Sequence, residues 1–198
     1  MDAVPLKLIV GLGNPGAEHE RQRHNAGFSF VEALAARHGG TFRYEPRHQA
    51  DLARVRMADH EVWLAKPMTY MNCSGGPTGS VAGFYKIAPD EILVAYDELD
   101  FPPGEARLKF GGGHGGHNGM RDILANTAEG FWRLRLGIGH PGDRNKVLNY
   151  VLGRPSKADE ELIGVAIAAA ADAVPMMMQH GAQRAIQALH GRPAEGSR

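Results

Sequence analysis

The amino-acid sequence predicts an α/β fold, organised as a single-domain three-layer α/β/α sandwich with a mixed, largely parallel central sheet. Apolar runs typical of buried strands alternate with helical patterns along the chain. The two strongest runs, residues 6–12 and 91–96, both end in polar loops. A chain of 198 residues without a shift in composition is long enough for one core. We therefore expect one domain over residues 1–190 and a disordered tail over residues 191–198.

The first half of the chain is expected to begin with a buried strand. Residues 6–12 form a nearly continuous apolar run that ends in the turn sequence Gly-Asn-Pro-Gly. A helix then starts at Asn25, because Phe28 and Leu34 fall on one face and glycines at 39–40 provide a stop. The pattern that follows indicates strands at residues 51–56 and 61–65, a loop at 67–72, and a helix at 74–86 capped by Ser74.

The second half is expected to complete the sheet and to add long C-terminal helices. Strands are indicated at residues 91–96, 106–110 and 133–138, and a helix begins near residue 120. The last strand alternates Arg-Leu-Arg-Leu, which predicts a half-exposed strand with its arginines on one side. Residues 156–189 are helical in composition, although Pro175 must kink this segment or start a new helix. The methionines at 176–178 are expected to fill the core.

The composition argues against several classes of protein. The 22 lysines and arginines balance the 22 aspartates and glutamates, so the net charge predicts neither a nucleic-acid nor a membrane partner. The single cysteine, Cys73, rules out a disulfide within the chain and a cysteine-based zinc site, and we expect it to be buried. No apolar run approaches the ~20 residues of a membrane span, and the N-terminus lacks the pattern of a signal peptide. We therefore expect a cytoplasmic protein.

A glycine-rich segment, residues 111–119, carries two histidines and an asparagine on nearly bare backbone. It joins a predicted strand to a predicted helix, so its N–H groups and the positive end of the helix dipole could bind an anion such as a phosphate. A flexible loop with solvated histidines explains the same residues equally well. The spacing His114-x-x-His117 also suggests a metal, but a glycine loop holds metal ligands poorly, so an unmetallated role is favoured.

The segment from Gly11 to Gly16 matches the dinucleotide-binding pattern G-x-G-x-x-G after a strand. That pattern needs a helix that opens at the third glycine and an acidic residue roughly 20 positions later, at the end of a second strand. Here Pro15 stiffens the turn, polar residues continue to His24, and the later position falls inside a predicted helix. The segment therefore does not predict a nucleotide site.

Several polar side chains indicate a hydrolytic site without a nucleophilic side chain. His24, Asp97 and His117 lie where predicted strands end or loops meet helices, the usual place for chemistry in an open sheet. A histidine can take a proton from water at neutral pH, and a carboxylate on its other nitrogen would fix its tautomer. Asparagines can donate to an oxyanion or accept from a substrate N–H, although singly they are more often turn residues. The loops contain Asn14, Asn72 and Asn118.

Local charge is consistent with a partner that carries phosphates. Between residues 106 and 154 there are eight lysines and arginines but three acidic residues, on a protein that is neutral overall. This basic region surrounds the glycine-rich segment, as expected for an enzyme that meets a phosphate backbone on one face. An ordinary solvated surface is the alternative interpretation.

Together these residues resemble the bacterial-type peptidyl-tRNA hydrolase family. The resemblance rests on ordered blocks that span nearly the whole chain: residues 11–16, 23–27, 66–75, 97–100, 111–118 and 137–142. It implies a catalytic domain that hydrolyses the ester between a peptide and the 3′-terminal ribose of tRNA, and thus peptidyl-tRNA as partner. It further implies a cytoplasmic monomer with no cofactor, no metal, no obligate protein partner and no membrane association.

The resemblance also implies roles for individual residues. His24 would be the general base, Asp97 the carboxylate that holds it, and Asn14 would help to discriminate N-blocked substrate from free aminoacyl-tRNA, so these three form the catalytic group. The residues that would bind the 3′ end and the peptide are His19, Tyr70, Asn72, His117 and Asn118. Those that match positions contacting the tRNA backbone are Arg107, Lys109, Arg135 and Arg144.

The chain departs from the usual pattern of this family at a few positions. His19 and Gln22 stand where the family usually has a tyrosine and a threonine, and Gly76 stands where a lysine often follows Ser-Gly. His19 can still stack on a base or contact a phosphate, but it adds a titratable group near His24. Two other functions are weighed: an RNA-binding protein that has lost turnover, and a metal-dependent peptidase that a chelator would inactivate.

Overall fold

The computed structural model describes residues 3–190, and the tail predicted over residues 191–198 lies outside this range. A seven-stranded sheet forms the centre, in the order β2-β3-β4-β1-β5-β7-β6. Its strands are β1 (Leu8–Gly11), β2 (Arg43–Glu45), β3 (Ala50–Met57), β4 (His60–Pro67), β5 (Ile92–Glu98), β6 (Ala106–Phe110) and β7 (Trp132–Gly137). The four central strands β4, β1, β5 and β7 are parallel, whereas β2, β3 and β6 join as antiparallel neighbours.

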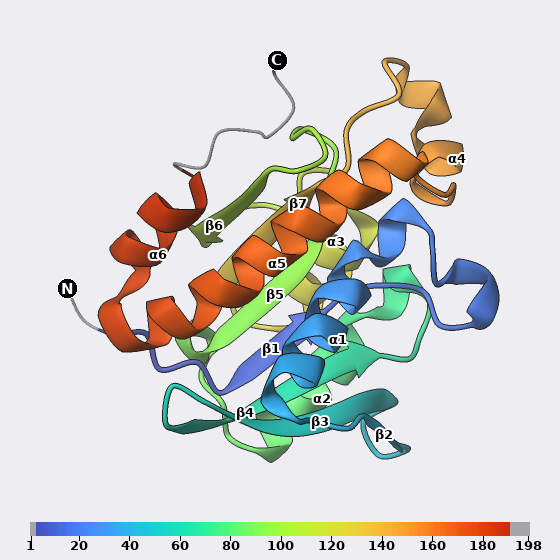
Figure 1. Ribbon diagram of the computed structural model, residues 1–198. Helices are drawn as coiled ribbons and strands as arrows, with labels where there is room; N and C mark the ends of the chain where they lie inside the picture. Colours follow the sequence, from blue (N-terminus) through green and yellow to red (C-terminus); the bar gives the residue numbers. More distant parts are fainter. Residues whose placement is uncertain (1–2, 191–198) are drawn as a thin grey trace.

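Helices cover both faces of this sheet and complete the three predicted layers (Figure 1). One face carries α1 (Ala26–His38), α5 (Lys157–His180) and α6 (Ala182–His190), and the other carries α2 (Gly75–Phe84) and α3 (Asn118–Asn126). The shorter elements used below are α4 (Val147–Val151) and the 3-10 turns η1 (Ala17–His19), η2 (Arg23–Asn25), η3 (Met71–Cys73) and η5 (Arg144–Lys146). The predicted α/β sandwich with a mixed sheet is thereby confirmed.

Alternating side chains of the strands feed two hydrophobic cores, one on each face. In β3, Ala53 and Val55 point into the core under α1 and α5, whereas Leu52 points into the core under α2 and α3. Helix α1 contributes Phe30 and Leu34, both fully buried. Burying a side chain of this size stabilises the fold by about 1.5–3 kcal/mol, so this one helix face anchors the segment that precedes it.

Three expectations from the sequence were wrong, and one strand was missed. Ser74 does not cap α2, because its hydroxyl donates to the carbonyl of Met71, while the Gly75 N–H donates to a carboxylate oxygen of Asp122 in α3 at 2.7 Å. Cys73 is exposed rather than buried. The strand β7 is not half-exposed, since Arg133 is only 2% exposed. Finally, β2 was not anticipated, because its three residues are all exposed and carry no apolar alternation.

Helix α5 runs through Pro175 and ends before Gly181, so no new helix starts at the proline. It is long and apolar enough to cross a membrane by length and composition, with a mean hydropathy of 1.6, although Asp172 interrupts the apolar run. Its buried residues, among them Val174 and Met177, belong to the core shared with α1 and the sheet. The position of α5 is that of a core helix.

The first turn of α1 packs directly against the backbone of the sheet. A Cβ atom at Gly27 would come within 3.0 Å of the Ala95 carbonyl and of the Leu12 backbone, and a Cβ atom at Gly11 would meet the Gly27 carbonyl. The Phe28 N–H donates to the Leu12 carbonyl at 3.2 Å. Glycine is required here for close approach, and this contact fixes where η2 meets the end of β5.

We expect Gly27→Ala to lower the free energy of unfolding by about 3 kcal/mol, because the added methyl group has backbone on every side and cannot be accommodated by rotation of a side chain. Gly164→Ala in α5 is the matched control, since nothing lies within 4 Å of a Cβ atom there. The control should be neutral or stabilising by up to ~1 kcal/mol. Urea denaturation measures both, and equal stabilities of the two variants would contradict this account.

Candidate active site

The carboxyl ends of two parallel strands place His24, Asp97 and His117 next to one another. Asp97 is near the end of β5 and is 3% exposed. His24 lies in η2, which follows the turn after β1, and His117 precedes the first residue of α3. The His24 and His117 ring centroids are 5.0 Å apart. Elements that are distant in sequence therefore converge on one buried carboxylate.

Both oxygens of Asp97 are used, one for each histidine. Oδ2 lies 2.8 Å from Nδ1 of His24, and Oδ1 lies 2.8 Å from Nε2 of His117. A carboxylate only accepts hydrogen bonds, so each facing nitrogen carries a proton. Nδ1 of His117 accepts from the Met120 N–H at 3.2 Å, which fixes that ring as the Nε2–H tautomer. In the neutral form of His24, the free lone pair is therefore on Nε2.

The pKa values of His24 and Asp97 reflect this arrangement. Burial lowers the pKa of His24, but the charge and hydrogen bond of Asp97 outweigh burial and raise it above the ordinary value of 6.5. Burial raises the pKa of Asp97, whereas the two histidines overcome this effect and hold it well below its usual range. Asp97 is therefore ionised at neutral pH, and its charge favours the imidazolium form of His24.

The same side chains meet the first requirement of a metal site, because one ligand atom from each lies within 4.8 Å of the others. The two nitrogen–oxygen distances are both 2.8 Å, whereas two ligands of a tetrahedral zinc lie about 3.3 Å apart. The geometry is that of a hydrogen-bonded chain. His114 is exposed and accepts from the Gly116 N–H at 2.9 Å, so the H-x-x-H spacing does not bring its two rings together.

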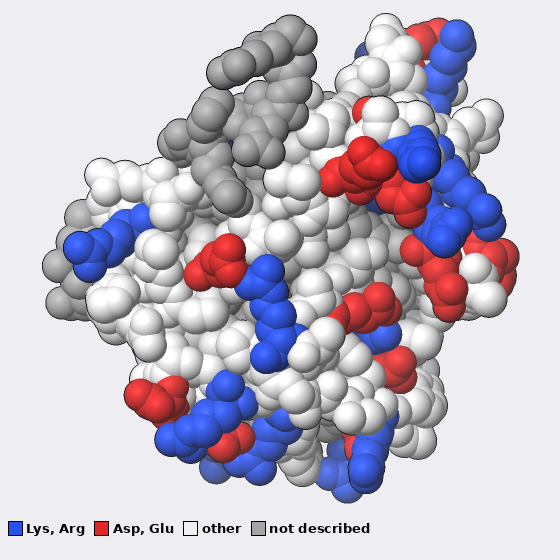
Figure 2. Space-filling model, in the orientation of Figure 1, with Lys and Arg blue, Asp and Glu red and all other residues white. Residues whose placement is uncertain are grey.

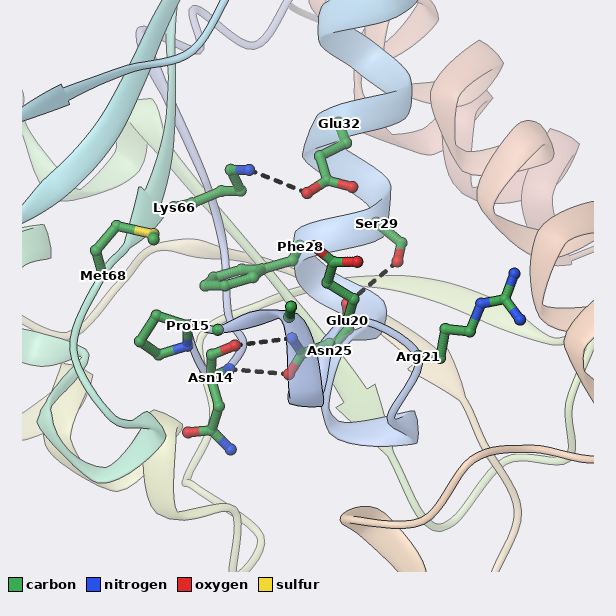
Figure 3. Close-up of a pocket in the computed structure, with 12 residues that line it drawn as sticks. Asn14, Pro15, Glu20, Arg21, Asn25, Phe28, Ser29, Glu32, Lys66 and Met68 are labelled. Atoms are coloured by element: carbon green, nitrogen blue, oxygen red, sulfur yellow. Dashed lines mark hydrogen bonds and ion pairs between the residues drawn. The ribbon is translucent and has the colours of Figure 1, made fainter.

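Asn14 is held by a network that leaves its amide nitrogen as a donor (Figure 3). Its backbone N–H and carbonyl bind the side chain of Asn25, both at 2.9 Å. Its side-chain oxygen accepts from the Met71 N–H at 2.7 Å, so the orientation of the amide follows from this bond. Asn14 also lines a cavity of about 510 Å³ that extends past Phe28 to Lys66. The side-chain amide of Asn14 points away from Phe28 and Lys66, and its nitrogen can offer a donor to a carbonyl group beside this cavity.

A second cavity brings together two of the other predicted asparagines. Asn72 in η3 and Asn118 at the start of α3 line about 440 Å³ together with Arg121 and Asp122. Both asparagines are exposed, and Oδ1 of Asn118 accepts from Arg121 at 3.1 Å. Tyr70 lies beside them in sequence and is 71% exposed. This cavity can receive a polar ligand with hydrogen-bonding groups.

Two further predicted binding residues have hydrogen-bond partners within the protein. Nδ1 of His19 lies 2.8 Å from the side-chain oxygen of Gln22, and its Nε2 lies 3.7 Å from Glu18. Both ring nitrogens of His117 are engaged, by Asp97 and by the Met120 N–H. Since protein groups are hydrogen-bonded to both nitrogens of His117, its predicted contact with substrate would have to use the ring face or the C–H edges.

The glycine-rich segment is an anchored loop rather than a flexible one. The N–H groups of Gly111, Gly116 and His117 donate within the protein, to Phe131, to His114 Nδ1 and to the His114 carbonyl. The carbonyls of Gly112 and Gly113 accept from the buried guanidinium of Arg133. Three N–H groups of the predicted anion cradle are thus used by internal bonds.

Three of the four cations predicted to contact the tRNA backbone lie on β6 and β7. Arg107 pairs across the strands with Arg135, and Lys109 with Arg133. The guanidinium groups of Arg107 and Arg135 lie 4.7 and 4.8 Å from the Phe101 ring. Like charges that face each other across a sheet repel, and Glu105 and Glu98 pair with Arg107 and Arg135, so the remaining positive charge is suited to bind an anion. Arg144, the fourth predicted cation, lies in η5, outside these strands.

Sequence reasoning missed two residues that organise the site. Asn25 lies in residues 23–27, one of the sequence blocks that carry the family resemblance, but its hydrogen bonds to the backbone of Asn14 were not anticipated. Arg133 was interpreted as a surface arginine of an alternating strand. The available signal for Arg133 was its place on the next strand after a glycine-rich segment, with one helix between them, because such a segment exposes many carbonyls that need donors.

Comparisons with known proteins agree on one family. A family described as peptidyl-tRNA hydrolase matches residues 8–196. The chain is 52% identical over 188 residues to the peptidyl-tRNA hydrolase of Edwardsiella ictaluri, which covers 94% of this chain and 96% of that protein. It is 53% identical over 186 residues to that of Stenotrophomonas maltophilia, covering 93% and 97%. The crystal structure of peptidyl-tRNA hydrolase from Acinetobacter baumannii matches with a TM-score of 0.94 and 44% identity, over 98% of this chain and 99% of that chain.

We expect Asp97→Asn to lower the pKa of His24, because the substitution removes the charge that raises it and leaves burial, which lowers it. NMR titration of the His24 ring measures the shift directly. His60→Gln, at the exposed start of β4, is a control that should leave the His24 titration unchanged. An unchanged or higher pKa of His24 in Asp97→Asn would show that Asp97 does not set it.

Proposed function

Because the chain belongs to the peptidyl-tRNA hydrolase family, we propose that His24 activates water in the hydrolysis of peptidyl-tRNA. The chain is an ester hydrolase that acts on this substrate. One observation carries the role of His24: the 2.8 Å contact between its Nδ1 and Asp97 leaves Nε2 as the nitrogen that can accept a proton. The charge of Asp97, which raises the pKa of His24 above its ordinary value, also stabilises the imidazolium that forms when the ring accepts a proton.

The proposed reaction begins when Nε2 of His24 takes a proton from water as the water oxygen attacks the ester carbonyl. Asp97 stabilises the imidazolium that forms, and His117 holds Asp97 by its second oxygen. The ester bond then breaks, and the proton passes from Nε2 to the departing ribose oxygen. General-base assistance of this kind supplies about 10²–10⁴-fold in rate. Amide N–H groups of Asn72 and Asn118 are positioned to bind carbonyl or oxyanion oxygens of substrate.

Asn14 provides a physical basis for discrimination between blocked and free substrates. Its oxygen is occupied by Met71, so the substrate meets the amide N–H₂. In an N-blocked aminoacyl ester, the amide carbonyl next to the ester can accept from this group. A free aminoacyl ester has an ammonium there instead, which has no acceptor. We place the peptide along the 510 Å³ cavity that Asn14 lines.

The cations of β6 and β7 are the proposed contact for the tRNA backbone. Side chains Arg107, Lys109 and Arg135 lie on the sheet face away from α5, since Leu108 and Leu134 between them enter the core under α5. The α1–α5 face, by contrast, mixes both signs of charge without a continuous basic area (Figure 2). Arg144 would add a contact from η5. We further propose that the enzyme works in the cytoplasm, where its substrate arises, as a monomer without metal, membrane or obligate protein partner.

We expect His24→Ala to lower kcat on N-acetyl-aminoacyl-tRNA by about 10²–10⁴-fold, because the water loses its proton acceptor. Deacylation is followed by release of labelled amino acid, in the presence of a chelator. His60→Ala, a histidine at the opposite end of the sheet, should retain wild-type turnover. Undiminished turnover of His24→Ala would remove the proposed base, and loss of wild-type activity in chelator would favour a metal-dependent reaction.

We expect Asn14→Asp to reduce kcat/KM for N-acetyl-aminoacyl-tRNA by about tenfold to hundredfold, because a carboxylate keeps the bond from Met71 and loses the donor. The low activity on free aminoacyl-tRNA should change much less, so the preference between the two substrates narrows. Deacylation of both, measured side by side on one tRNA, gives the ratio. An unchanged ratio would assign discrimination to other groups.

A further inference from the structure

We propose that Arg133 is a positioning residue for the reaction, which anchors the glycine-rich loop so that His117 reaches Asp97. This inference rests on the proposed roles of His24 and Asp97. Arg133 touches none of the three side chains in the hydrogen-bonded chain. It acts on them through the backbone of residues 112–117.

The contacts of Arg133 are those of an anchor. It is 2% exposed and belongs to the largest fully buried side chains of the described residues. Its two terminal nitrogens donate to the carbonyls of Gly112 and Gly113, and its guanidinium lies 4.9 Å from the Phe131 ring centroid. None of the ion pairs found over residues 3–190 involves Arg133. A buried cation without a carboxylate partner is costly, so its stabilising contacts are these carbonyls, the Phe131 ring and the side chain of Tyr96, whose ring also lies against His117.

The loop between the anchor and His117 has little rigidity of its own. Gly112, Gly115 and Gly116 all have positive φ values, of 108°, 58° and 81°. Fixing such residues costs more conformational entropy than fixing any other type. The bond from the His117 N–H to the His114 carbonyl, at 3.0 Å, closes a turn within the loop but does not tie it to the sheet.

The sheet holds the loop at two points instead. Arg133 in β7 holds its beginning, and Asp97 in β5 holds its end through His117. The strands β5 and β7 are neighbours, with Val94 opposite Arg133 and Asp97 opposite Leu136. Because both points belong to one rigid pair of strands, the distance between the anchor and Asp97 is constant. Release of Arg133 would leave the mostly glycine backbone between it and His117 without its tie to β7, so that His117 would be held only by Asp97 and by the start of α3.

Arg135 provides a matched comparison on the same face of the same strand. It lies two residues further along β7, is partly exposed, and contacts Phe101 and Glu98 rather than the loop. If both arginines served only to bind phosphate, equivalent substitutions would have similar effects. The burial of Arg133 instead predicts that its effect falls on turnover and that the effect of Arg135 falls on binding.

The test uses Arg133→Met and Arg135→Met in the full chain. Arg133→Met should lower kcat at least tenfold with KM changed less than twofold, whereas Arg135→Met should mainly raise KM and reduce the salt dependence of kcat/KM. In a His117→Ala background, Arg133→Met should change kcat less than about twofold, because the two residues act in series. If instead the losses in kcat of the two single variants multiply in the double variant, the two residues act independently and the proposal is wrong.

Imidazole ¹⁵N spectra provide a readout that does not depend on activity. In the wild type, His117 should report a protonated Nε2 and an unprotonated Nδ1, and Arg133→Met should show mixed tautomers. Arg133→Lys, which restores one hydrogen-bond donor, should recover part of the wild-type His117 spectrum and part of kcat. The lysine variant replaces Arg133→Met in the test if the methionine variant does not fold. An unchanged His117 tautomer in a folded Arg133 variant would refute the anchoring. If His24→Ala remains active, the proposed base is wrong, while these spectra still decide whether Arg133 holds the loop.

Discussion

The structure of the site depends on one buried carboxylate shared by two histidines. A carboxylate that is 3% exposed stays ionised only if both oxygens are satisfied, and Asp97 achieves this with one imidazole N–H on each. That requirement explains why three elements meet at this point: β5 supplies the carboxylate, η2 supplies His24, and the loop before α3 supplies His117. It also fixes opposite tautomers on the two rings. The open nitrogen of His24 is a consequence of the way in which Asp97 is buried.

Much of the fold could be predicted because the signals are local. Apolar runs marked β1 and β5, glycines at 39–40 marked the end of α1, and strand β6 was predicted with its observed bounds. His24, Asp97 and Asn14 stood out as polar residues beside strand ends, and the resemblance to a known family suggested their roles. The structure adds the contacts of these side chains, such as the hydrogen bond from the Met71 N–H that fixes the orientation of the Asn14 amide.

What could not be predicted depends on contacts between residues distant in sequence. Ser74 has the right type and position for an N-cap, yet Asp122, 47 positions away, supplies the acceptor for Gly75 instead. Arg133 follows an alternating pattern that normally indicates a surface, but a loop folds over it and buries it. His117 was expected to meet substrate, and only the tertiary structure reveals that Asp97 and Met120 occupy both of its nitrogens. In each case the partner is set by packing rather than by spacing.

The facing cations of β6 and β7 have a consequence for the protein before any RNA arrives. Arg107 lies opposite Arg135, and Lys109 lies opposite Arg133, so like charges face each other in two adjacent cross-strand pairs, and Glu105 and Glu98 offset the repulsion only at Arg107 and Arg135. Packing in the core under α5 holds these strands together against that repulsion. A bound polyanion removes the repulsion and adds attraction, and dissolved salt screens it as well. If these cations bind the tRNA backbone as proposed, the relief of this repulsion adds to the free energy of binding.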